Sequence, residues 1–127
     1  MRSPGVALAA AVVLAAEGLA LLGFAIVELV GLGAGDAAST STALALIVLT
    51  LIGAAALISF AIGTRAGRSW ARSGGIVFQV LAVALAFASL TVQPIAWAFI
   101  IACAVPGIVG FILLIASSRA ENERPAE

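Results

Sequence analysis

The chain has 127 residues, of which 64% are hydrophobic and only 9% are charged, and its formal net charge is zero. Soluble domains are about half apolar and about a quarter charged, so this composition excludes an ordinary water-soluble core. The charge balance also offers no basic surface for nucleic acid, and no nucleic-acid partner is expected.

Two long stretches without charged side chains set the number of membrane spans. They cover residues 37–64 and residues 73–118. Because a spanning helix needs roughly 20 apolar residues, the first stretch holds one span and the second holds two. With the apolar run near the N-terminus, they predict an all-α, polytopic membrane protein. Residues 1–118 are expected to form one antiparallel bundle of four transmembrane helices.

The first helix is predicted over residues 6–30. The glycine-rich segment 31–36 follows, and glycine is about 1 kcal/mol less favourable than alanine inside a helix. Since Arg2 precedes the apolar run, a cleavable signal peptide is an alternative interpretation of this segment. Cleavage before Gly18 would leave a remnant too short to span comfortably, so we favour an intact helix.

The second helix is predicted over residues 41–64, because the preceding run of serine and threonine offers N-cap side chains at Ser39, Thr40 and Ser41. A short basic turn separates it from the third helix, which is predicted over residues 70–92.

The fourth helix is predicted over residues 95–117. Gln93 and Pro94 introduce it, and proline is well suited to the first turn of a helix. The charged tail 119–127 is expected to be disordered.

All six arginines lie outside the apolar runs, and lysine and histidine are absent. If the helices cross in alternation, the arginines fall on one side of the membrane: Arg2, Arg65, Arg68, Arg72, Arg119 and Arg124. Positive charge in short loops marks the cytoplasmic side. We therefore expect a multi-pass protein of the cell membrane with both termini, and the tail, in the cytoplasm.

The two tryptophans are consistent with this orientation. Trp70 falls at the predicted inner boundary and Trp97 at the outer one, where indole side chains prefer to lie. Arg65, Arg68 and Arg72 are placed to contact lipid headgroups or a partner in the cytoplasm. The lipid bilayer is thus the first expected partner, and these five residues are the expected contacts.

Glu17 is the strongest candidate for chemistry, because it lies near the middle of the first predicted span. A carboxylate at that depth costs about 2.5–3.5 kcal/mol, so such groups face a bundle interior or water. Desolvation favours the neutral, protonated carboxyl. The functional interpretation is a proton or cation relay. The structural one, which the missing second acid or base at this depth favours, is a hydrogen bond between helices.

Gln79 and Thr50 lie at similar predicted depths in the third and second helices, within roughly 4 Å of the midplane. Together with Glu17 they form a candidate intramembrane polar site. For Thr50 a local bond to the carbonyl four residues earlier is the favoured alternative.

Pro106 and Gly107 interrupt the fourth helix near its centre and form a candidate kink. Proline removes the backbone bond to Ala102, and the freed carbonyl can accept from a protonated Glu17 or bind a cation. Ordinary helix packing is the alternative that we favour.

Several absences bear on catalysis. The chain has no histidine or lysine, one cysteine and one methionine, Met1. No metal site, haem or other cofactor is expected from this set. An acid–base mechanism needs two positioned groups and only Glu17 is buried, so we expect a non-enzyme.

The segment from Arg68 to Arg72, which carries Trp70, opens a helix that contains Gln79. In this turn and in overall layout the chain resembles small four-helix integral membrane proteins of actinobacteria, a group with no assigned activity. The resemblance implies a membrane location and a four-helix architecture.

Two functions remain open from the sequence. We favour an accessory or interaction protein that packs with itself or with another membrane protein through faces of small residues. The alternative is a small homo-oligomeric transporter or channel in which Glu17 exchanges a proton or a cation.

Overall fold

A computed structural model describes residues 4–35, 38–95 and 97–122 of the chain. It contains four helices, α1 (Pro4–Gly33), α2 (Thr40–Arg65), α3 (Ser69–Ser89) and α4 (Trp97–Asn122), and these residue ranges include no strand. Each helix is long and apolar enough to cross a membrane. The all-α, four-helix prediction is confirmed, and the fold fits a multi-pass membrane protein.

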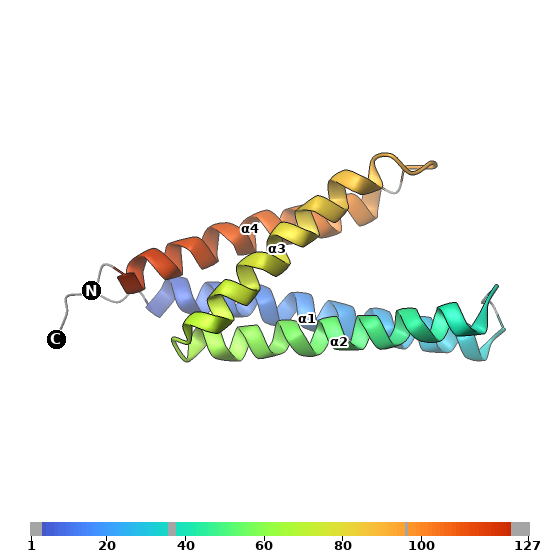
Figure 1. Cartoon of the computed structure of the whole chain (residues 1–127), viewed down its shortest axis with the longest axis horizontal. Coiled ribbons are helices and arrows are strands. Elements are labelled where there is room, and N and C mark those ends of the chain that lie inside the picture. The colour runs from blue at the N-terminus through green and yellow to red at the C-terminus, as the bar shows by residue number, and fades with distance from the viewer. Residues whose placement is uncertain (1–3, 36–37, 96, 123–127) are drawn as a thin grey trace.

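The helices alternate in direction, so one end of the bundle collects the beginnings of α1 and α3 and the ends of α2 and α4 (Figure 1). We call this the arginine end, because the described arginines lie there: Arg65, Arg68, Arg72 and Arg119. The α1–α2 and α3–α4 connections lie at the opposite end, which we call the far end.

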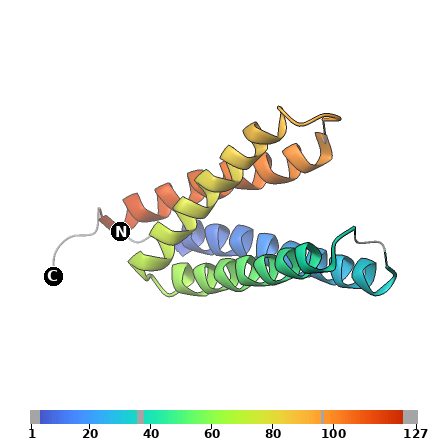
Figure 2. The same cartoon turned by 45° about the vertical axis from the view of Figure 1, so that its right-hand side comes forward.

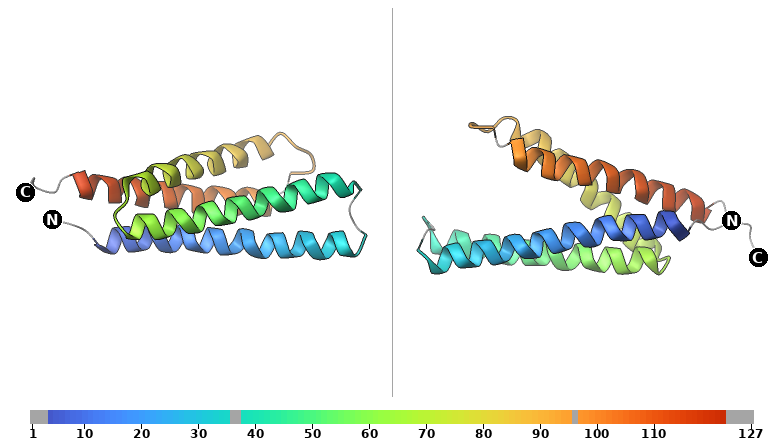
Figure 3. Two further views of the ribbon diagram at one scale, coloured as in Figure 1. Left: turned by 60° about the horizontal axis from the view of Figure 1, so that its bottom comes forward. Right: turned by 180° about the vertical axis from the view of Figure 1, so that it is seen from behind.

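The bundle consists of two helical hairpins, α1–α2 and α3–α4. The hairpins meet towards the arginine end and diverge towards the far end, as Figures 1 and 2 show. The view from behind shows the same divergence (Figure 3, right). The contact between hairpins is therefore concentrated in the half of the bundle nearer the arginine end.

Local chemistry explains where α2 begins and ends. The Ser39 hydroxyl oxygen accepts a hydrogen bond from the Thr42 backbone N–H at 3.4 Å, which confirms the predicted N-cap. At the other end, Gly67 has a φ of +79°, and the Arg68 N–H donates to the Gly63 carbonyl at 2.8 Å. A glycine in the left-handed region with this bond is the usual way to stop a helix.

The connection between α3 and α4 is longer than the sequence suggested. The N–H groups of Leu90 and Thr91 bond to carbonyls three residues earlier, which tightens the chain and ends α3 at Ser89. Pro94 lies in the connection rather than in the first turn of a helix, because α4 begins only at Trp97. A residue before proline avoids helical geometry, which favours an extended Gln93.

α4 continues to Asn122, beyond its predicted end at residue 117. The expected disorder of the tail therefore does not apply to residues 119–122, and residues 123–127 lie outside the described part of the chain. Leu114 is fully buried and Ser117 is nearly so, which fixes the turns that precede the extension.

A small core joins the two hairpins on the arginine side of Glu17. Its buried members are Ala10, Leu14, Leu57, Ala61 and Leu114. α3 enters this core through Gly75, where an added Cβ would lie 2.9 Å from Leu114 Cδ1. Most other large apolar side chains are exposed, as expected for helices that face lipid.

Candidate functional site

Glu17 and Gln79 meet inside the bundle. Gln79 Nε2 donates a hydrogen bond to Glu17 Oε2 at 2.9 Å, which links α3 to α1. Gln79 is fully buried and Glu17 is partly buried. Two of the three residues of the expected polar cluster are thus brought together.

Gly110 on α4 provides the space for the Gln79 side chain. A Cβ at Gly110 would lie 2.9 Å from Gln79 Cδ and 3.0 Å from Nε2. One turn earlier, a Cβ at Gly107 would lie 3.4 Å from the Gln79 carbonyl oxygen. The missing side chains let α3 approach α4 closely, so the Gln79 amide is positioned by packing as well as by its bond to Glu17.

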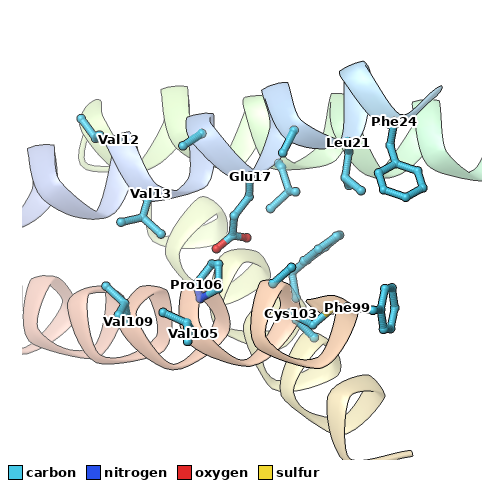
Figure 4. A pocket seen from close by; sticks show the side chains of 16 residues that line it. Val12, Val13, Glu17, Leu21, Phe24, Phe99, Cys103, Val105, Pro106 and Val109 are labelled. Atoms are coloured by element: carbon cyan, nitrogen blue, oxygen red, sulfur yellow. The ribbon is translucent and has the colours of Figure 1, made fainter. Parts of the chain in front are cut away.

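Gly18 has the same role beside Glu17. An added Cβ there would lie 2.9 Å from Ile58 Cγ1 and 3.3 Å from the Ala54 carbonyl oxygen. The backbone of α1 is therefore held tightly against α2 on one side, and the neighbouring Glu17 side chain projects away from α2, towards α4 (Figure 4).

The Glu17 side chain faces a cavity of about 550 Å³ between the hairpins, which we call the Glu17 cavity. Figure 4 shows the carboxyl pointing from α1 towards Pro106 on α4. Apolar side chains make up almost the whole wall. The residues around it include Val13, Leu21, Phe24, Phe78, Phe99, Cys103, Pro106 and Val109.

Two acceptor atoms of this site have no hydrogen-bond partner among the described residues. They are Glu17 Oε1 and Gln79 Oε1, and both are buried. A buried acceptor without a donor is unfavourable by about 1–3 kcal/mol. A proton on the carboxyl, or a donor from a molecule in the Glu17 cavity, removes this cost.

The surroundings of the Glu17 cavity differ along the bundle. On the arginine side of Glu17 lies the joint core, with Leu14 and Leu114 fully buried. On the far side the hairpins diverge (Figure 1), and Phe24 and Phe99 mark that end of the Glu17 cavity (Figure 4). Residues on both sides of Glu17 line the cavity and are exposed, Val12 and Val109 on the arginine side and Phe24 and Phe99 on the far side, so the Glu17 cavity is open towards the lipid along its length.

Thr50 does not join the cluster. Its hydroxyl donates to the Leu46 carbonyl at 2.7 Å, the expected local bond, and lies 3.4 Å from Glu28 Oε1. The packing of Gly18 against Ala54 explains this, because Thr50 is one turn nearer the far end than Ala54.

Pro106 is inside α4 and lines the Glu17 cavity beside Cys103. Gly107, the second residue of the candidate kink, is buried against α3. The two residues therefore lie on different faces of α4. Pro106 borders the Glu17 cavity, and Gly107 allows α3 to pack closely.

The predicted surface contacts are placed unequally. Arg65, Arg68, Trp70 and Trp97 are exposed, which suits contact with lipid headgroups. Arg72 is only 7% exposed, in contrast to the expectation of a surface arginine.

The helical period accounts for the burial of Arg72. Residues 72, 75 and 79 lie on one face of α3. This face packs on α4, as the contacts of Gly75 and Gln79 show.

Sequence reasoning missed the glycines that shape the site and the aromatic end of the Glu17 cavity. Gly110 gave a signal only through its spacing of three residues from Gly107. Phe24 and Phe99 gave none, because every face of these helices is apolar.

Comparison with models of known protein families, with curated proteins and with solved structures finds no significant match. The resemblance to actinobacterial membrane proteins stays a prediction. The site is therefore the basis on which we infer function.

Proposed function

We propose that the protein is a small transporter in which Glu17 exchanges a proton or a cation with a molecule that enters the Glu17 cavity. The observation that carries this proposal is the partly satisfied carboxyl. Oε2 of Glu17 is held by Gln79, whereas the buried Oε1 has no partner among the described residues and the side chain faces an apolar cavity.

The location of Glu17 in the bundle supports this proposal. The joint core lies between Glu17 and the arginine end of the bundle, and the cavity is open at Val12, Phe24 and Phe99. A transporter requires two states in which such a site is reached from opposite sides of the membrane. We place the arginine end in the cytoplasm, following the distribution of positive charge.

Flux measurements with two matched variants test this function. Proteoliposomes with an entrapped pH dye receive a potassium diffusion potential, and proton uptake is followed with and without sodium. We expect wild-type protein and Glu28→Gln to change the internal pH, without sodium if Glu17 carries protons alone and only with sodium if Glu17 exchanges sodium for protons. We expect Glu17→Gln to fold normally and to lose the flux, since glutamine retains the shape but cannot ionise. Flux in Glu17→Gln equal to wild type, or wild-type liposomes equal to empty ones, would contradict the proposal.

An accessory or interaction role is a second candidate, and the bond between Gln79 and Glu17 favours it. That bond ties the two hairpins together, which is sufficient reason for a carboxyl at this depth. In this role the protein packs with itself or with another membrane protein. Native mass spectrometry of gently extracted protein then finds assembly almost unchanged in Glu17→Gln and weakened in Glu17→Leu. Unchanged assembly in Glu17→Leu removes Glu17 from this account.

A further inference from the structure

We propose that the Glu17 cavity binds a lipid-soluble amine, a molecule with an apolar body and a nitrogen that carries at least one hydrogen. This inference names the ligand class of the proposed transporter and so rests on that function. The Glu17 cavity has a volume of about 550 Å³. This volume lies within the range of small-molecule sites, which are mostly apolar with a few precisely placed polar groups.

The polar end of the ligand follows from one oxygen atom. Oε2 of Glu17 already accepts from Gln79 Nε2, so its direction is fixed. Oε1 is buried and has no donor among the described residues. The other residues that line the Glu17 cavity are apolar apart from Cys103, a weak donor. The cavity therefore presents one strong polar group, the Oε1 position of Glu17, which donates its proton when the carboxyl is neutral and accepts a hydrogen bond when the carboxyl is ionised.

Charge balance selects an amine among possible donors. In apolar surroundings Glu17 is most stable as the neutral acid, and an amine crosses the hydrocarbon as the uncharged base. When the two meet, the carboxyl O–H bond breaks and a new N–H bond forms. The product is a carboxylate beside an ammonium, with no change in total charge. The new ammonium then donates to Oε1, and such charge-assisted bonds are the strong ones.

The apolar body of the ligand has a direction. Phe24 on α1 and Phe99 on α4 lie together at the far end of the Glu17 cavity, away from the Glu17 carboxyl (Figure 4). On the other side of Glu17 the cavity is lined by Val12, Val13 and Val109 and has neither of these aromatic rings. With nitrogen at Glu17, the hydrocarbon part therefore extends towards Phe24 and Phe99.

Three probes with the same alkyl chain distinguish amines from uncharged alcohols and from quaternary ammonium ions. Dodecylamine supplies both charge and an N–H donor. Dodecanol supplies a donor that cannot become a cation, and dodecyltrimethylammonium supplies a cation without a donor. Because Glu17 Oε1 needs both, we expect dodecylamine to bind at least about tenfold more tightly than either, a difference of about 1.4 kcal/mol.

The single cysteine provides the measurement. Cys103 lines the Glu17 cavity, so the rate at which N-ethylmaleimide alkylates it in lipid nanodiscs reports occupancy. We expect dodecylamine to slow alkylation in wild type and in Glu28→Gln, at concentrations where the other two probes have little effect. We expect at least a tenfold loss of this protection in Glu17→Gln, which retains the shape of the side chain.

Three results would overturn the inference. The first is equal protection by dodecanol, which would mean that the Glu17 cavity holds any alkyl chain. The second is full protection in Glu17→Gln. The third is a Cys103–Cys103 disulfide between copies, formed in membranes and insensitive to dodecylamine, which would assign the Glu17 cavity to a second copy of the chain.

The two proposals fail separately. Protection of Cys103 by dodecylamine without proton or cation flux keeps the amine site and removes the transporter. Flux that depends on Glu17, without such protection, keeps the transporter and removes the amine.

Discussion

Gln79 Nε2 lies 2.9 Å from Glu17 Oε2, although the two residues are 62 positions apart in the chain. The bond joins α3 of one hairpin to α1 of the other. It lies beside both the joint core and the Glu17 cavity, which extends along the bundle on both sides of Glu17. The stability of the bundle and the chemistry of the Glu17 cavity therefore depend on the same pair of side chains.

Replacement of Gln79 by leucine is expected to destabilise the fold by about 1 kcal/mol, the usual size of a hydrogen bond between membrane helices. The leucine leaves Glu17 without its donor. Unfolding by sodium dodecyl sulfate in mixed micelles measures the change, with Val80→Leu as the control, because Val80 is exposed on the same helix. Equal stability of Gln79→Leu and wild type would show that the bond contributes nothing.

Gly110→Ala tests the space behind the Gln79 amide. The new Cβ would lie 2.9 Å from Gln79 Cδ and must displace the side chain, at a cost of about 1 kcal/mol or more. The cost is expected to shrink in a Gln79→Ala background, where the obstructing atoms are gone. A double-mutant cycle by the same unfolding assay measures this coupling.

Gly23→Ala is the matched control for this cycle, since no heavy atom lies within 4 Å of its added Cβ. It should leave stability unchanged or raise it by up to about 1 kcal/mol, the difference in helix propensity. Additive effects of Gly110→Ala and Gln79→Ala would contradict the packing described above.

Gly63→Ala addresses the joint between the hairpins at the arginine end. Its Cβ would overlap that of Ala71, and a Cβ fixed to the backbone cannot turn aside, so α2 and α3 must separate. We expect a loss of about 1–3 kcal/mol, typical of overpacking. A stability equal to that of Gly23→Ala would show that the hairpins are not held together here.

Reporter fusions test the orientation. A fluorescent protein fused after the C-terminus is expected to fluoresce and alkaline phosphatase there to be inactive, because the arginines favour a cytoplasmic location. Phosphatase fused within the connection between α1 and α2 should be active. The reverse pattern would mean that the arginine end faces away from the cytoplasm.

Much of the fold could be predicted because the charged residues are few and leave long uncharged stretches between them, and because capping residues mark some helix ends. The uncharged stretches gave four helices, and Ser39 marked the beginning of α2. The end of α3 and the beginning of α4 were less accurate. Between them the chain changes from helix to connection inside the uncharged stretch 73–118, where no charged residue marks either boundary.

The site could be predicted only in part, for a related reason. Depth along a helix follows from residue number, and it correctly brought Glu17 and Gln79 to one level. The relative placement of two helices does not follow from residue number, since it depends on the angle at which the helices cross. Thr50 consequently lies beside Glu28, and Arg72 is buried.

The Glu17 cavity could not be predicted from the sequence. Lipid and protein interior are equally apolar, so no pattern in the sequence distinguished the faces of α1 and α4 that line it.

Modification by a hydrophobic carbodiimide tests most directly the central claim, that the Glu17 carboxyl is protonated and faces an accessible apolar cavity. The reagent adds to protonated carboxyl groups in apolar surroundings, and peptide mass spectrometry locates the adduct. We predict modification of Glu17 in native membranes, with a rate that dodecylamine lowers. An unmodified Glu17 under conditions in which Glu28 reacts would contradict the claim and leave Glu17 as a purely structural link to Gln79.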